Sequence, residues 1–197
     1  MNAYPLSNLT GRRLLLASAS PRRRELLAML DVEFMRPDPV EVDESYPSSL
    51  PVDEVPLYLS RLKAQAYMPT LNPDDVLITA DTVVIVDNHV LGKPVDSDDA
   101  RRMLTMLSGR THRVVTGVAV TDTVHQQSFT ACTEVEFAPL TDSEINYYVN
   151  RFHPPDKAGA YGIQEWIGAI GIKGIKGSFY NVMGLPIHRL YDVLRHF

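Results

Sequence analysis

The chain has 197 residues, of which 45% are hydrophobic and 22% charged, with a formal net charge of −5. This composition is typical of a folded globular protein and excludes a disordered chain, and the acidic total predicts no nucleic-acid partner. A single cysteine excludes internal disulfides and a four-cysteine zinc site, in agreement with a reducing cytoplasm. With no signal peptide and no apolar run of about twenty residues, we expect a cytoplasmic protein without a membrane partner.

The first predicted strand and helix are arranged as in an anion-binding site. An apolar strand over Leu14–Ala17 leads into a helix expected over residues 21–30. Ser20 is a good N-cap and Pro21 a good first helical residue, so three arginines, 22–24, lie in the first turn. Because the helix dipole makes this end positive, a phosphate chain would compensate them. A solvated basic turn paired with acidic residues is the equally open alternative.

A proline-rich acidic loop follows. Residues 32–36 are expected as a second strand, after which Pro37, Pro39, Pro47 and Pro51 enforce a non-helical stretch. The loop between Pro39 and Pro47, residues 40–46, carries three carboxylates, Glu41, Asp43 and Glu44. Such a loop is a natural place for function. Before the first strand, residues 1–12 are expected to form a poorly ordered extension.

Asp81 is an anomaly in the next strand. Apolar residues at helical spacing predict a helix over residues 53–67, and the β-branched run over residues 76–86 predicts a strand that contains Asp81. An unpaired charge inside a strand is costly. Asp81 must therefore lie at an exposed strand end, meet a cationic partner or bind a metal.

The remaining elements complete an α/β pattern. They are a turn at 87–88 before a strand at 90–91, a helix over 97–107 ended by Ser108-Gly109, an antiparallel strand pair over 111–121 and 127–137, a helix over 141–150 and a last helix from Leu185-Pro186. Seven of the eleven glycines lie between Gly159 and Gly184, which favours tight loops around a ligand. We expect His112 and Cys132 to be strand residues rather than a metal ligand and a nucleophile.

The charged candidates together suit phosphoanhydride cleavage. They are the basic residues Arg22, Arg23, Lys63 and Lys93 and the carboxylates Glu44 and Asp81. That reaction needs cations around the phosphate oxygens, a hard divalent ion on oxygen ligands, and a carboxylate that orients or deprotonates water.

Several motifs, in this order, resemble the Maf family of nucleoside triphosphate pyrophosphatases. They are residues 17–23 (ASASPRR), 61–64 (RLKA), 80–84 (ADTVV), 91–94 (LGKP), 107–112 (LSGRTH), 156–164 (DKAGAYGIQ) and 177–186 (GSFYNVMGLP). The resemblance covers nearly the whole chain. It implies one Maf-like domain over residues 1–197, with an inosine triphosphatase-like α/β fold: a two-lobed mixed sheet with flanking helices and a central substrate cleft.

The resemblance also implies an activity, hydrolysis between the α- and β-phosphates of a nucleoside triphosphate with Mg²⁺, Mn²⁺ or Co²⁺ present. Asp81 matches the proton acceptor, and Asp81 and Glu44 would hold the metal, with Glu41 and Asp43 close enough to leave the register open. The positions that contact phosphate in the family are matched by Arg23, Lys63 and Lys93. Ser18 and Ser20 lie at the turn that would wrap around a phosphate. Arg22, Thr82 and Gln164 match the positions that select the base.

The base preference implied is for dTTP and UTP rather than 7-methyl-GTP. An amide such as Gln164 can donate to and accept from the O4, N3–H edge that uracil and thymine share. Glu165 follows Gln164 where many relatives have a small residue, so a different base preference stays open.

Two further expectations concern the role of the chain. It could be a nucleotide-binding regulator, for example of cell division, in which binding rather than turnover matters. Its partner is expected to be a small-molecule nucleotide, and a homodimer is plausible.

Overall fold

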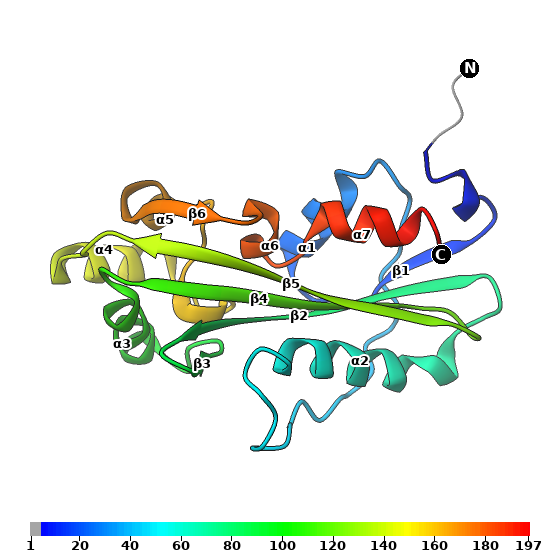
Figure 1. Cartoon of the computed structure of the whole chain (residues 1–197), viewed down its shortest axis with the longest axis horizontal. Helices are drawn as coiled ribbons and strands as arrows, with labels where there is room; N and C mark the ends of the chain where they lie inside the picture. Colours follow the sequence, from blue (N-terminus) through cyan, green and yellow to red (C-terminus); the bar gives the residue numbers. More distant parts are fainter. Residues whose placement is uncertain (1–4) are drawn as a thin grey trace. The chain divides into compact units, whose positions relative to one another are not determined.

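The fold is built on a mixed six-stranded sheet with flanking helices, as a computed structural model of residues 5–197 shows (Figure 1). The strands are β1 (Arg13–Leu16), β2 (Asp75–Val86), β3 (His89–Leu91), β4 (Thr111–Thr121), β5 (Gln126–Phe137) and β6 (Ile172–Lys176). Their order is β1-β2-β4-β5-β6, and β3 pairs with β2. The β1–β2 pair is parallel, whereas β2–β3 and β5–β6 are antiparallel, which confirms the predicted α/β class with a mixed sheet.

Seven α-helices and three short 3₁₀ helices accompany the strands in the described residues. The α-helices are α1 (Pro21–Ala28), α2 (Val55–Tyr67), α3 (Ser97–Leu107), α4 (Asp142–Phe152), α5 (Trp166–Gly171), α6 (Phe179–Met183) and α7 (Ile187–Leu194). The 3₁₀ helices are η1 (Ser7–Leu9), η2 (Met68–Thr70) and η3 (Ala158–Ala160). Over residues 5–197, every helix is too short or too polar to cross a bilayer.

Local capping chemistry explains where the predicted helices begin. Ser20 caps α1 by accepting from the Arg23 amide, with Pro21 as the first helical residue. Thr141 and Glu144 form the reciprocal capping box of α4. Asp96 caps α3, a residue that the sequence pattern did not single out.

Two segments differ from the expectations. The strand expected over residues 32–36 is reduced to one bridge between Leu15 and Met35, because Pro37 and Pro39 have no N–H with which to extend the pairing. Part of the glycine-rich region forms α5, β6 and α6 rather than loops alone. Of the extension expected over residues 1–12, residues 1–4 lie outside the described part, and Asn8 donates to the Leu194 carbonyl at 2.8 Å.

The chain divides into two compact units, whose boundaries fall within β2, β4 and β5. The first comprises residues 1–81, 116–131 and 184–197, and the second residues 82–115 and 132–183. In the first, Leu15 of β1 and Leu77 of β2 pack with Tyr67 of α2. In the second, one apolar core joins strands β2, β4 and β5 to helices α3, α4 and α5.

Candidate active site

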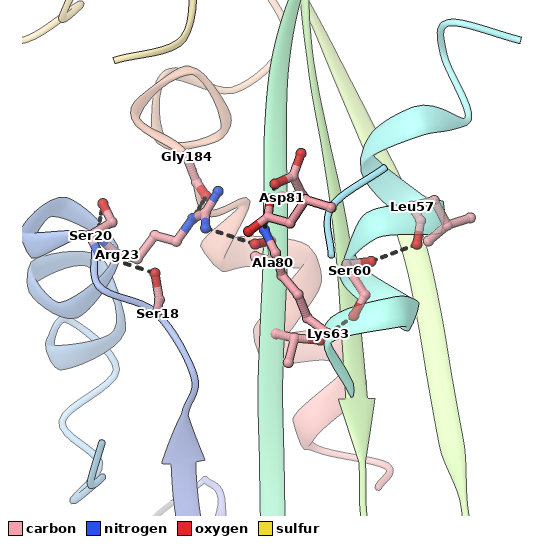
Figure 2. Close-up of polar contacts among 11 residues, drawn as sticks. Ser18, Ser20, Arg23, Leu57, Ser60, Lys63, Ala80, Asp81 and Gly184 are labelled. Carbon is pink, nitrogen blue, oxygen red and sulfur yellow. Dashed lines mark hydrogen bonds and ion pairs between the residues drawn. The ribbon is translucent and has the colours of Figure 1, made fainter. Parts of the chain in front are cut away.

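One lysine joins two carboxylates in the first unit. Lys63 Nζ lies 2.8 Å from Asp81 Oδ1 and 2.9 Å from Glu44 Oε2. The side chains of Lys63 and Asp81 are 16% and 14% exposed, whereas that of Glu44 is 53% exposed. Of the three options left open for Asp81, a cationic partner is therefore the one seen, and Figure 2 shows Lys63 reaching it from α2.

Buried contacts between α2 and the sheet place Lys63. Thr79 lies two residues before Asp81 on the same face of β2, and its hydroxyl donates to the Ser60 carbonyl of α2 at 2.7 Å. Lys63 follows Ser60 by three residues and so lies on the same side of the helix. Gly117 of β4 lets the first turn of α2 approach, because a Cβ there would lie 2.3 Å from the Leu57 backbone nitrogen.

The acidic loop brings one of its three carboxylates to Lys63. The loop is held near its start by the Val40 amide, which donates to the Tyr67 hydroxyl at 3.1 Å. Glu44 makes the ion pair with Lys63, whereas Asp43 accepts from the Ser45 amide and Glu41 is exposed. Of the three carboxylates, Glu44 is therefore the one that an ion pair joins to Lys63 and, through it, to Asp81.

Arg23 reaches β2 from α1 and forms a hydrogen bond to the backbone beside Asp81. Its Nη1 donates to the Ala80 carbonyl at 2.7 Å and its Nε to the Gly184 carbonyl at 2.8 Å (Figure 2). Burial lowers the pKa of the Arg23 guanidinium, an effect that the charges of Asp81 and Glu44 oppose. Sequence reasoning missed these two carbonyl contacts, since backbone acceptors carry no residue-type signal.

The strand-to-helix turn supplies further polar groups to the same neighbourhood. Ser18 Oγ accepts from the Ser20 amide at 3.2 Å, and Ser20 Oγ accepts from the Arg23 amide at 3.5 Å. Both hydroxyls thus order the turn. Arg22, half-buried, is close enough to Arg23 for its charge to lower the pKa of Arg23 further.

The carboxylates fit a hard divalent cation by their chemistry. Asp81 and Glu44 converge on a single cationic group from separate segments, and both offer oxygen donors. Within residues 5–197 no group of three or more His, Cys, Asp or Glu side chains could hold a metal. Two carboxylates are nonetheless a sufficient protein contribution for Mg²⁺, which takes its other ligands from water and substrate phosphates.

Three of the expected site residues belong to the second unit. Thr82 is a half-buried residue of β2, and Lys93 is exposed just after β3. Gln164 is exposed and is one of the residues that line a pocket of about 410 Å³, whose apolar lining includes Ile172, Ile175 and Phe179. His112 and Cys132 lie in β4 and β5, as predicted.

The amino-acid sequence of the chain matches a known protein family. The family of Maf-like proteins matches residues 13–197. The dTTP/UTP pyrophosphatase of Phocaeicola vulgatus is 53% identical over 190 residues, covering 96% of this chain and 98% of the relative. The dTTP/UTP pyrophosphatase of Porphyromonas gingivalis is 52% identical over 194 residues, covering 98% of each.

Among solved structures, the likeness is more distant. A HAM1 protein from Coxiella burnetii is 17% identical, with a TM-score of 0.49, and the match covers 94% of this chain and all of that one.

Proposed function

Because the chain belongs to the Maf family, we propose that it hydrolyses dTTP and UTP to the nucleoside monophosphate and pyrophosphate. The observation that carries the proposal is the Lys63 ammonium, which joins Asp81 and Glu44 while Arg23 holds the neighbouring backbone. Carboxylates and cations in direct contact supply both parts of the reaction: a base for water and positive charge for phosphate oxygens.

Asp81 is assigned the role of general base, which takes the proton of the attacking water. The water oxygen forms a bond to phosphorus, the bond from phosphorus to the bridging oxygen breaks, and Asp81 takes the proton that the water releases. Lys63 orients the Asp81 carboxylate and neutralises charge on the phosphate chain. Contacts to phosphate from Arg23, Lys93 and the turn of Ser18 and Ser20 stay predictions from the resemblance.

Asp81 and Glu44 are the residues that would hold a divalent cation such as Mg²⁺, Mn²⁺ or Co²⁺. When bound, such an ion supplies Lewis-acid stabilisation of charge on the phosphate oxygens. Gln164, with Thr82 and Arg22, is assigned base selection, because its amide can both donate to and accept from the edge of uracil or thymine. A cytoplasmic location and a homodimer stay predictions.

The first prediction is tested with a panel of nucleoside triphosphates and a divalent cation, by assay of pyrophosphate and identification of the monophosphate. We expect release from dTTP and UTP. Replacement Asp81→Asn should lower kcat by about 100-fold or more, since a positioned base contributes roughly 10²–10⁴-fold. Asp98→Asn in α3 is the matched control, because the Asp98 side chain is 95% exposed.

Two outcomes would contradict the proposal: no pyrophosphate from any pyrimidine nucleotide, or full activity in Asp81→Asn. Calorimetry that shows tight nucleotide binding without product would support a binding regulator instead.

A further inference from the structure

Gln164, the residue assigned to base selection, lies in a tight turn. The Glu165 amide donates to the Gly162 carbonyl at 3.0 Å, which leaves Ile163 and Gln164 as the two central residues of the turn. Gln164 is exposed and Ile163 is buried, and both line the pocket described above together with Glu165. The backbone position from which the Gln164 side chain projects is therefore set by this one turn.

A buried tyrosine ties the two ends of the turn together. Tyr148 of α4 is fully buried, and its hydroxyl accepts from the Gly162 amide at 3.1 Å. The same hydroxyl donates to Glu165 Oε2. One oxygen atom on a rigid helix thus fixes both the residue before Ile163 and the residue after Gln164.

The second carboxylate oxygen of Glu165 is also engaged. Lys157 Nζ lies 3.1 Å from Glu165 Oε1 and 2.9 Å from Asp156 Oδ1, and the Lys157 side chain is 8% exposed. Because a buried ammonium requires charged partners, Lys157 holds the carboxylates of Glu165 and Asp156 beside it. The Glu165 carboxylate is therefore part of the scaffold of the turn.

Close packing leaves the turn little room for another conformation. A Cβ at Gly162 would lie 2.8 Å from Glu165 Cδ, and a Cβ at Gly168 of α5 would lie 1.9 Å from the Ile163 carbonyl oxygen. The turn is thus confined by the carboxylate on one side and by α5 on another.

We propose that Glu165 is a positioning residue for base selection, which acts through Tyr148 and Lys157 to hold Gln164 in the orientation that reads uracil and thymine. This inference rests on the proposed function, because it concerns the selectivity of that same reaction. Glu165 lines the same pocket as Gln164, but both of its carboxylate oxygens are engaged, one by Tyr148 and the other by Lys157, so its carboxylate stabilises the turn.

The test is steady-state kinetics with UTP and CTP. In Glu165→Ala the ratio of kcat/KM for UTP to that for CTP should fall by about tenfold, mainly through a higher KM for UTP. Glu165→Gln should recover part of the ratio, because its amide oxygen can still accept from Tyr148. Tyr148→Phe should lower the ratio as well. The double variant Tyr148→Phe/Glu165→Ala should lower it by less than the product of the two single effects, because both single variants remove the bond between Tyr148 and Glu165.

Glu134→Gln is the matched control, since Glu134 pairs with Lys176 at 3.7 Å and its side chain is 47% exposed. The inference is overturned if the UTP-to-CTP ratio is unchanged in Tyr148→Phe and Glu165→Ala. It is also overturned if kcat falls equally for both nucleotides with KM unchanged, since a purely structural role would give that result.

Calorimetry measures the selectivity without turnover. The ratio of the affinities for UTP and CTP is compared between Asp81→Asn and the double variant Asp81→Asn/Glu165→Ala. Absence of pyrophosphate release by the wild-type chain would defeat the proposed function alone. An unchanged affinity ratio would defeat the inference about Glu165.

Discussion

At the scale of single residues, Arg23 links α1 to the middle of β2 and to the backbone before α7. Two of its nitrogens donate to the Ala80 and Gly184 carbonyls, at 2.7 and 2.8 Å. A planar guanidinium spans two acceptors that a single ammonium on a flexible stem cannot reach together. The same side chain that was expected to contact phosphate therefore also fixes the backbone from which Asp81 projects.

Replacement Arg23→Lys is expected to lower the free energy of unfolding by about 1–3 kcal/mol, because at least one buried carbonyl loses its donor. Urea unfolding measures this change. Arg24→Lys, at the exposed neighbouring position of α1, should leave the unfolding midpoint where it is. Equal stabilities of the two variants would show that the carbonyl contacts of Arg23 contribute nothing.

At the scale of elements, the position of α2 relative to β4 depends on Gly117. A Cβ at this position would lie within 2.4 Å of backbone atoms of Pro56 and Leu57. Backbone cannot move aside as the end of a side chain can, so α2 must shift as a whole. That shift would carry Lys63 away from Asp81.

Gly117→Ala is therefore expected to destabilise the protein by roughly 1–3 kcal/mol through overpacking, and to lower pyrophosphatase activity as well. Thermal unfolding and the pyrophosphate assay measure the two effects. Gly92→Ala provides the stability control, because its Cβ would have no neighbour within 4 Å. A Gly117→Ala variant as stable as Gly92→Ala would refute the argument.

Elements with local signals could be predicted from the sequence, and those that depend on distant partners could not. Ser20-Pro21 and the Thr141 capping box carry their own start signals, and α1 and α4 begin where these predict. The strand expected over residues 32–36 has the right composition but makes a single bridge, because the prolines that follow remove donors. Strand β6 could not be predicted from its glycine-rich sequence, because it depends on a long-range pairing with β5.

At the scale of the whole molecule, the chain's charged residues were predictable as a set but not as pairs. Glu44, Lys63 and Asp81 come from a loop, a helix and a strand, and their meeting depends on how α2 packs on β2. The resemblance pointed to Glu44 but left Glu41 and Asp43 as alternatives, because a proline-bounded loop has no periodicity that fixes its register. Only the folded chain distinguishes them.

The stability of the whole molecule should depend on pH through a buried histidine. His112 of β4 is 2% exposed, its Nε2 lies 2.7 Å from the Tyr161 hydroxyl, and its Nδ1 has no hydrogen-bond partner among residues 5–197. Burial lowers the pKa of His112 to about 4, whereas an unfolded histidine titrates near its usual value of about 6.5. Below pH 6.5 the unfolded chain therefore binds a proton that the folded chain does not bind.

The stability that this histidine contributes is accordingly complete above about pH 6.5 and is lost progressively as the pH falls towards 4, by roughly 3 kcal/mol in total. In His112→Gln, whose amide can still bond the Tyr161 hydroxyl, the free energy of unfolding should fall less steeply over this range. Urea unfolding at a series of pH values measures the slopes. His188→Gln is the control, because the His188 side chain is 84% exposed. Parallel pH profiles for wild type and His112→Gln would mean that His112 titrates alike in the folded and unfolded chains.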